Sequence, residues 1–85
     1  MDAYEIDIAN WLKGNGIDGD TAAAKALYSA LDRPGDYGAL AVERKGENTL
    51  VVGPAGELTV EGALGLQTLR LRLEEIINHP GQPVI

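Results

Sequence analysis

Leucine and isoleucine recur at steps of three and four residues near the C-terminal end of the chain. These positions are Leu66, Leu69, Leu73, Ile76 and Ile77. Such spacing places all of them on one side of an α-helix, because successive turns bring residues three and four apart to the same face. The pattern predicts a helix over residues 62–78 whose apolar stripe must be buried against another layer.

Three short apolar runs immediately precede this helix and predict the layer on which it packs. They are Ala39–Val42, Leu50–Val52 and Leu58–Val60. Turn residues separate the runs at 45–48 and 53–56, so we interpret them as an antiparallel meander with one apolar and one polar face. Residues 57–61 alternate as a third strand would, but they also adjoin the helix and are alternatively its lead-in.

Two shorter helices are predicted before the strands. Residues 3–13 carry apolar side chains at helical spacing, including Trp11, the only tryptophan. Residues 21–31 are rich in Ala, the strongest helix former, and Asp20 is placed to cap the first turn. A proline then ends the second helix, and residues 32–36 are expected to form a solvated loop.

The elements together predict an α+β fold. Two N-terminal helices are followed by a three-stranded antiparallel β-meander and a C-terminal helix packed on one face of the sheet, in the order α-α-β-β-β-α. Residues 1–79 are expected to form one small domain, and the Pro- and Gly-containing residues 80–85 a tail. A domain this small buries little more than about 60% of its unfolded surface, and a chain without Cys has no disulfide to stabilise it.

The charge of the chain favours a basic protein as its partner. The net charge is −6, and the first 36 residues hold seven acidic and three basic side chains. Nucleic acid and anionic membranes repel a surface of this sign. No apolar run reaches the roughly 18 residues that a membrane span needs. The first residues include Asp2 and Glu5 and lack the basic region of a signal peptide, so we expect a cytoplasmic protein.

No constellation of catalytic or metal-binding residues stands out. Ser29 is the only serine and His79 the only histidine, whereas nucleophilic catalysis needs a nucleophile and a base within reach of each other. The loop Gly14–Asp20 offers oxygen ligands, but a calcium loop needs Glu at its twelfth position, and counting from Asn15 reaches Ala26. We expect a non-enzymatic protein without cofactor or metal. A small enzyme, the third hypothesis, would need a pocket with acids of perturbed pKa.

The predicted C-terminal helix has apolar residues outside its main stripe. Leu64 and Leu71 point roughly the opposite way on a helical wheel. Either the helix lies between two layers, with the sheet on one side and the N-terminal helices on the other, or the two leucines form a partner or self-association surface. Trp11 is likewise either a core anchor or a contact hot spot.

The order helix, three strands, helix over residues 21–78 is similar in topology to double-stranded-RNA-binding domains. Those domains bring lysines to the start of the final helix, whereas residues 60–64 here are Val-Glu-Gly-Ala-Leu and the first base that follows is Arg70. The same order resembles small phage tail-terminator proteins, and the hairpin followed by a helix is similar to some small phage-encoded inhibitors of bacterial defence. These resemblances rest on element order and not on a specific motif, so they identify no family.

Two functions follow as hypotheses. The first is an inhibitor or adaptor from a phage or mobile element, acting in the host cytoplasm, that binds a basic, nucleic-acid-binding surface of a partner protein. Its candidate contacts are Asp18, Asp20, Asp32 and Asp36. The second is a structural subunit of an assembly, such as a phage virion or tail, that forms homo-oligomers. Its candidate contacts are Leu64, Leu71 and Trp11. Salt should weaken only the first kind of contact steeply, because exposed charges are screened within about 8–10 Å at physiological ionic strength.

Overall fold

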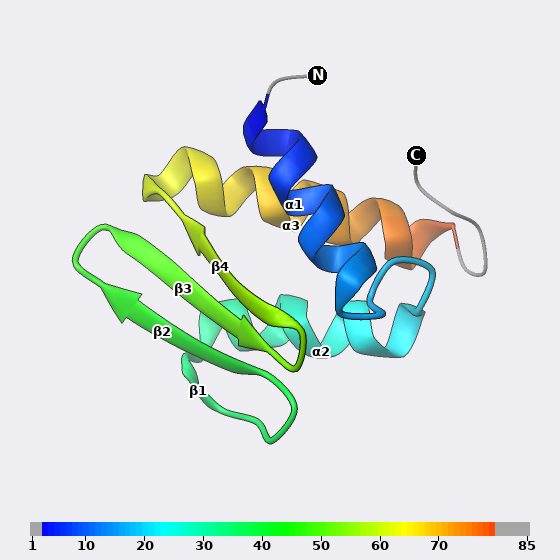
Figure 1. Ribbon diagram of the computed structural model, residues 1–85, viewed down its shortest axis with the longest axis horizontal. Coiled ribbons are helices and arrows are strands. Elements are labelled where there is room, and N and C mark those ends of the chain that lie inside the picture. Colours follow the sequence, from blue (N-terminus) through cyan, green and yellow to red (C-terminus); the bar gives the residue numbers. More distant parts are fainter. Residues whose placement is uncertain (1–2, 80–85) are drawn as a thin grey trace.

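The computed structural model describes residues 3–79 and shows an α+β fold in which three helices pack with one antiparallel sheet (Figure 1). In chain order the elements are α1 (Ala3–Gly14), α2 (Thr21–Asp32), β1 (Gly35–Asp36), β2 (Ala41–Lys45), β3 (Asn48–Gly53), β4 (Gly56–Val60) and α3 (Gly62–Asn78). The α+β class and the three helices agree with the prediction. The predicted tail at residues 80–85 lies outside the described residues.

The sheet has four strands in the order β1-β2-β3-β4, so the expectation of three strands is wrong. The additional strand is β1, two exposed residues that pair with β2 in the segment expected to be a loop. It forms because the chain turns back sharply after it. The Asp36 side chain accepts a hydrogen bond from the Gly38 amide at 3.0 Å, and the Tyr37 amide donates to the Leu40 carbonyl at 2.7 Å. Two residues are too few to show the alternation by which strands are recognised.

The other strands agree with the prediction in number and pairing. Residues 56–60 form β4, which pairs with β3, so the alternative that this segment leads into the helix is wrong. β2 begins at Ala41 rather than Ala39 and continues to Lys45. The hairpin to β3 is therefore tight, with Gly46 at the first loop position and a φ of +63°. Glycine suits that position because two-residue hairpin loops need a positive φ there.

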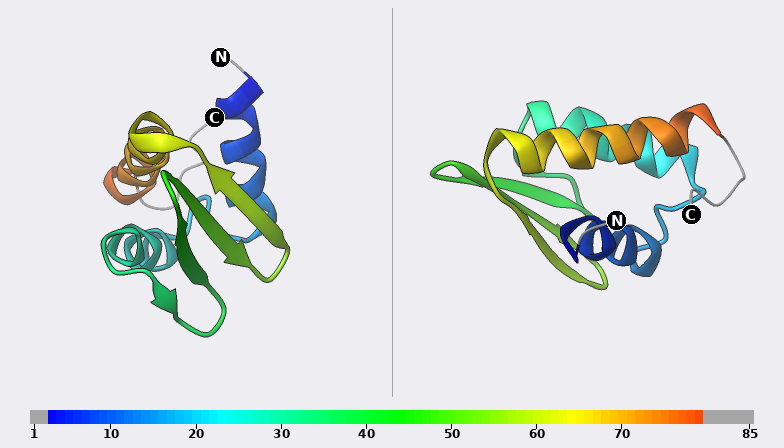
Figure 2. Two further views of the ribbon diagram at one scale, coloured as in Figure 1. Left: turned by 90° about the vertical axis from the view of Figure 1, so that its left-hand side faces the viewer. Right: turned by 90° about the horizontal axis from the view of Figure 1, so that it is seen from above.

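α2 and α3 lie side by side on one face of the sheet (Figure 2), with α2 against β2 and α3 against β3 and β4. The sheet contributes a row of buried side chains, which are Val42, Thr49, Val51, Leu58 and Val60. The predicted stripe of α3 meets this row, because Leu69, Leu73 and Ile76 are each 0% exposed. Leu27 and Leu31 of α2 complete the core from the second helix.

α1 lies beside β4, the edge strand, and also contacts α3. The helix ends in a Schellman motif, in which the Gly16 amide donates to the Lys13 carbonyl at 3.1 Å and the Ile17 amide donates to the Leu12 carbonyl at 2.9 Å. Gly16 has a φ of +71°, which this motif requires of the residue after the helix. Ile17 and Leu12 are both buried, as the apolar contact of the motif demands.

The C-terminal end of α1 is tied to the turn between β3 and β4. The indole nitrogen of Trp11 donates to the Gly56 carbonyl at 3.0 Å. The Asn15 side chain accepts from the Ala55 amide at 2.9 Å and donates to the Trp11 carbonyl at 2.8 Å. A Cβ atom at Gly53 would lie 2.3 Å from the Oδ1 atom of Asn15, so a side chain here would displace Asn15 from its position against the turn.

Candidate protein-binding surface

The structure places Leu64 and Leu71 on the surface of α3. The two side chains are 80% and 52% exposed. They are seven residues apart, which brings them to the same face of the helix two turns from each other. The first alternative for them, burial between two layers, is therefore wrong. α2 packs beside α3 and α1 packs at its other flank, so neither helix covers the side that bears these leucines.

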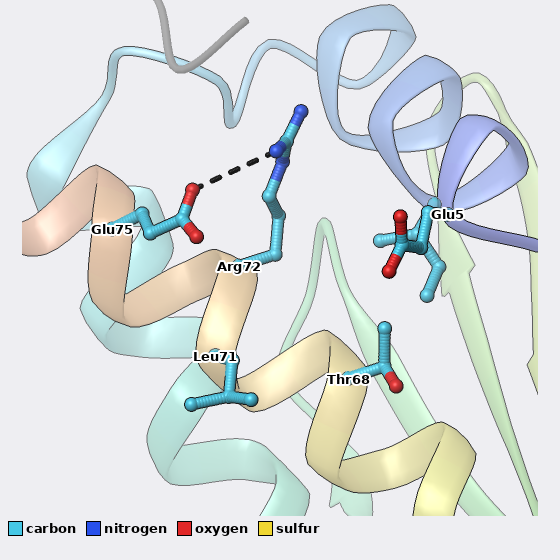
Figure 3. A pocket seen from close by; sticks show the side chains of 6 residues that line it. Glu5, Thr68, Leu71, Arg72 and Glu75 are labelled. Atoms are coloured by element: carbon cyan, nitrogen blue, oxygen red, sulfur yellow. Dashed lines mark ion pairs between the residues drawn. The ribbon is translucent and has the colours of Figure 1, made fainter. Parts of the chain in front are cut away.

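A shallow hollow of about 230 Å³ lies between α1 and α3 next to Leu71 (Figure 3). Its lining comes from both helices and consists of Glu5, Ile8, Thr68, Leu71, Arg72 and Glu75. Glu5 faces Thr68 across it, and Arg72 is paired with Glu75 at 3.6 Å on one side (Figure 3). Four of the six lining residues are polar or charged, and of the two apolar ones Ile8 is 1% exposed and Leu71 is 52% exposed. A partner that docks on Leu71 would therefore also meet polar groups.

The four aspartates proposed as contacts do not form one surface. Asp18 and Asp20 precede α2, whereas Asp32 and Asp36 lie at or beyond its other end. α2 has 12 residues, and a helix of that length is about 18 Å long. Each pair is therefore separated from the other by the length of the helix.

Three of these aspartates also have partners inside the domain. Asp20 caps α2 by accepting from the Ala23 amide at 3.1 Å. Asp32 forms an ion pair with Arg70 of α3, and Asp36 holds the turn after β1. Asp18 is half-buried in the loop before α2, and its Oδ1 atom has no hydrogen-bond partner among residues 3–79. Asp20, Asp32 and Asp36 thus each have a role inside the domain.

Asp20→Ala is expected to lower the free energy of unfolding by about 1 kcal/mol, because it removes the N-cap of α2. Asp20→Asn keeps a capping oxygen and should stay within a few tenths of a kcal/mol of the parent. Urea unfolding followed by circular dichroism measures both. Equal losses in the two variants would show that the charge of Asp20, and not its capping oxygen, is what stabilises the domain.

Trp11 lies in the core, with 8% of its surface exposed and its indole N–H bonded to the β3–β4 turn. Its side chain contributes to packing and is not part of the exposed face of α3. Nothing in the sequence indicates that Glu5 of α1 lines the same hollow as Leu71. A helical wheel places Thr68 and Glu75 beside Leu71, since they are three and four residues away. It gives no information on α1, whose position comes from tertiary packing.

Within residues 3–79, no three His, Asp or Glu side chains gather closely enough to hold a metal ion. None of the helices that the structure describes is both long and apolar enough to cross a bilayer. Comparison with protein-family models, with curated proteins and with solved structures finds no match to this chain.

Proposed function

We propose that the protein is a non-enzymatic binding module that docks a partner protein on the exposed face of α3. The observation that carries this proposal is the exposure of Leu64 and Leu71 on one side of a helix whose other side is core. Full burial of a Leu side chain contributes about 1.5–3 kcal/mol. Two such residues beside a hollow supply the apolar centre that a protein interface needs.

Acidic residues at both ends of this face select a basic partner. Glu61 precedes Leu64 by three residues, and Glu74 and Glu75 follow Leu71 by three and four. A partner that presents apolar residues flanked by Lys or Arg matches both features, because complementary charges at the rim speed association and reject other partners. A protein that covers a basic surface in this way acts as an inhibitor or adaptor. A phage origin is supported by element order alone, and binding through α3 is expected whatever the source.

The same charges disfavour self-association through this face. In a two-fold dimer every contact occurs twice with the roles of the copies exchanged. Antiparallel α3 helices that set Leu64 of one copy opposite Leu71 of the other would also set Glu61 of one copy near Glu74 of the other. Like charges facing each other oppose binding. A basic partner is therefore favoured over the homo-oligomer of a structural subunit, and light scattering should give a monomer at low and high salt.

The partner chemistry is testable with a library of displayed random peptides selected on the immobilised protein. We expect enriched peptides to combine two or more apolar anchors at helical spacing with flanking Lys or Arg. Their affinity should fall about tenfold or more in the Leu64→Ser/Leu71→Ser variant, because each lost apolar contact contributes about 1.5–3 kcal/mol when fully buried. Higher salt should weaken binding further.

Tyr37→Ser is the matched control, since it removes an exposed apolar side chain, 52% exposed, from the segment between β1 and β2. It should leave peptide binding unchanged. Peptides that bind the double serine variant as well as the parent would contradict docking on α3. If the parent forms a stable dimer and the double serine variant does not, the partner at this face is a second copy of the chain and not a basic protein.

A further inference from the structure

A second hollow, of about 480 Å³, lies where the end of α2 meets β2 and α3. Its lining residues are Leu31, Asp32, Pro34, Arg44, Leu66 and Arg70. The volume falls within the roughly 300–1,000 Å³ typical of small-molecule sites. Leu66 and Arg70, one helical turn apart, lie on the side of α3 away from Leu64 and Leu71. This hollow is therefore separate from the proposed protein-binding surface.

The hollow is basic although the protein is acidic. Its lining contains two guanidinium groups, from Arg44 on β2 and Arg70 on α3, and a single carboxylate, that of Asp32, which pairs with Arg70. The lining thus carries one net positive charge in a chain whose net charge is −6. Basic side chains brought together from separate elements by folding are suited to hold an anion.

Neither guanidinium has its hydrogen-bonding capacity filled within residues 3–79. Arg70 uses Nη2 in the ion pair with Asp32, while its Nε atom is buried and has no hydrogen-bond partner among those residues. Arg44 makes one long contact, from Nη1 to the Thr49 hydroxyl at 3.4 Å. Each guanidinium offers five N–H donors in a planar fork that matches a carboxylate.

We propose that this hollow binds an organic monocarboxylate with a short apolar body. The carboxylate would accept hydrogen bonds from Arg44 and Arg70, and the apolar body would lie on Leu31, Pro34 and Leu66. One negative charge balances the net positive charge of the lining, which favours a monocarboxylate over a phosphate dianion. A free small molecule and the carboxyl terminus of a peptide both supply this chemistry.

Asp32 sets the affinity of the hollow by competing for Arg70. An acidic residue at the C-terminal end of a helix faces the negative end of the helix dipole, so the position of Asp32 is explained by its ion pair with Arg70 rather than by α2. A bound carboxylate must share Arg70 with this side chain. Removing the charge of Asp32 should therefore strengthen binding of a carboxylate and not weaken it.

Titration at constant ionic strength, followed by NMR of the Leu methyl groups and arginine side chains, tests the site. The probes are hexanoate, hexanol, inorganic phosphate and a tetrapeptide that ends in Leu with a free carboxylate. We expect saturable shifts at Leu31 and Leu66 with the two carboxylates only. Tighter binding of hexanoate identifies a free small molecule as the source, and tighter binding of the peptide identifies a chain terminus; both support a carboxylate site.

Three variants separate this site from general charge attraction. Arg44→Gln should weaken hexanoate binding about tenfold or more, because hydrogen bonds between charged groups are stronger than those between neutral groups. Arg72→Gln removes the same charge from the first hollow, between α1 and α3, and should leave hexanoate binding unchanged. Asp32→Asn should tighten binding several-fold. Arg44→Lys keeps the charge but loses the planar pair of N–H donors, so its affinity for hexanoate should lie between those of the parent and Arg44→Gln.

Equal binding of hexanol and hexanoate would overturn the proposal, because it would show an apolar hollow with no anion recognition. Equal weakening by Arg44→Gln and Arg72→Gln would overturn it as well, since binding would then follow net charge. So would tighter binding of phosphate than of either carboxylate. None of these results bears on docking at the exposed face of α3, which is tested separately with the Leu64→Ser/Leu71→Ser variant.

Discussion

Leu73→Ala is expected to lower the free energy of unfolding by about 3 kcal/mol, within the range of roughly 2–5 kcal/mol seen when Leu is truncated in a core. Leu73 is 0% exposed and lies in the stripe of α3 that packs on the sheet and on α2. The surrounding side chains come from several elements and close only partly over the space left behind. In a domain of this size the loss corresponds to a fall in melting temperature of roughly 10 °C or more.

Leu71→Ala is the matched control, because it removes the same atoms two residues away on the same helix. Leu71 is 52% exposed, and substitutions at such sites usually change stability by no more than about 0.5 kcal/mol. The loss of unfolding free energy, measured by thermal and urea unfolding, should therefore be several-fold larger for Leu73→Ala than for Leu71→Ala. Similar losses at the two positions would contradict the assignment of one face of α3 to the core and the other to the surface.

The contrast between these leucines also shows what the sequence does and does not determine. The stripe of Leu69, Leu73 and Ile76 was predictable because a period near 3.6 has one structural explanation, a helix buried along one side. The leucines outside the stripe had two explanations. The wheel gives the direction of a side chain, but whether a second layer covers that direction depends on where α1 and α2 pack, which is set by contacts distant in sequence.

The fourth strand and the basic hollow could not be predicted from the sequence, for a related reason. β1 is two residues long, and among the residues that the structure describes it pairs with β2 alone, so neither composition nor alternation marks it. Arg44 and Arg70 lie 26 residues apart in the sequence and line one hollow only because the last helix crosses the sheet beside α2. The aspartates illustrate the converse, since their abundance suggested a surface, whereas Asp20 caps α2 and Asp32 pairs with Arg70 of α3.

The largest expected effect outside the central core is at the contact between α1 and the β3–β4 turn. Gly53→Ala places a methyl group 2.3 Å from the Oδ1 atom of Asn15 and 3.1 Å from Cζ2 of Trp11. Asn15 must move away and lose its hydrogen bond with Ala55. We expect a loss of about 1–3 kcal/mol, the usual range for overpacking. Gly14→Ala is the control, because a methyl group there meets nothing within 4 Å.

A double-mutant cycle with Asn15→Ala identifies the cause. Asn15→Ala alone should destabilise by about 1 kcal/mol for its lost hydrogen bonds. In that background Gly53→Ala no longer meets the amide group, so its own effect should shrink towards zero and the pair should be coupled by about 1 kcal/mol or more. Urea unfolding of the four proteins gives this coupling. Additive losses would mean that Trp11 and not Asn15 excludes the methyl group.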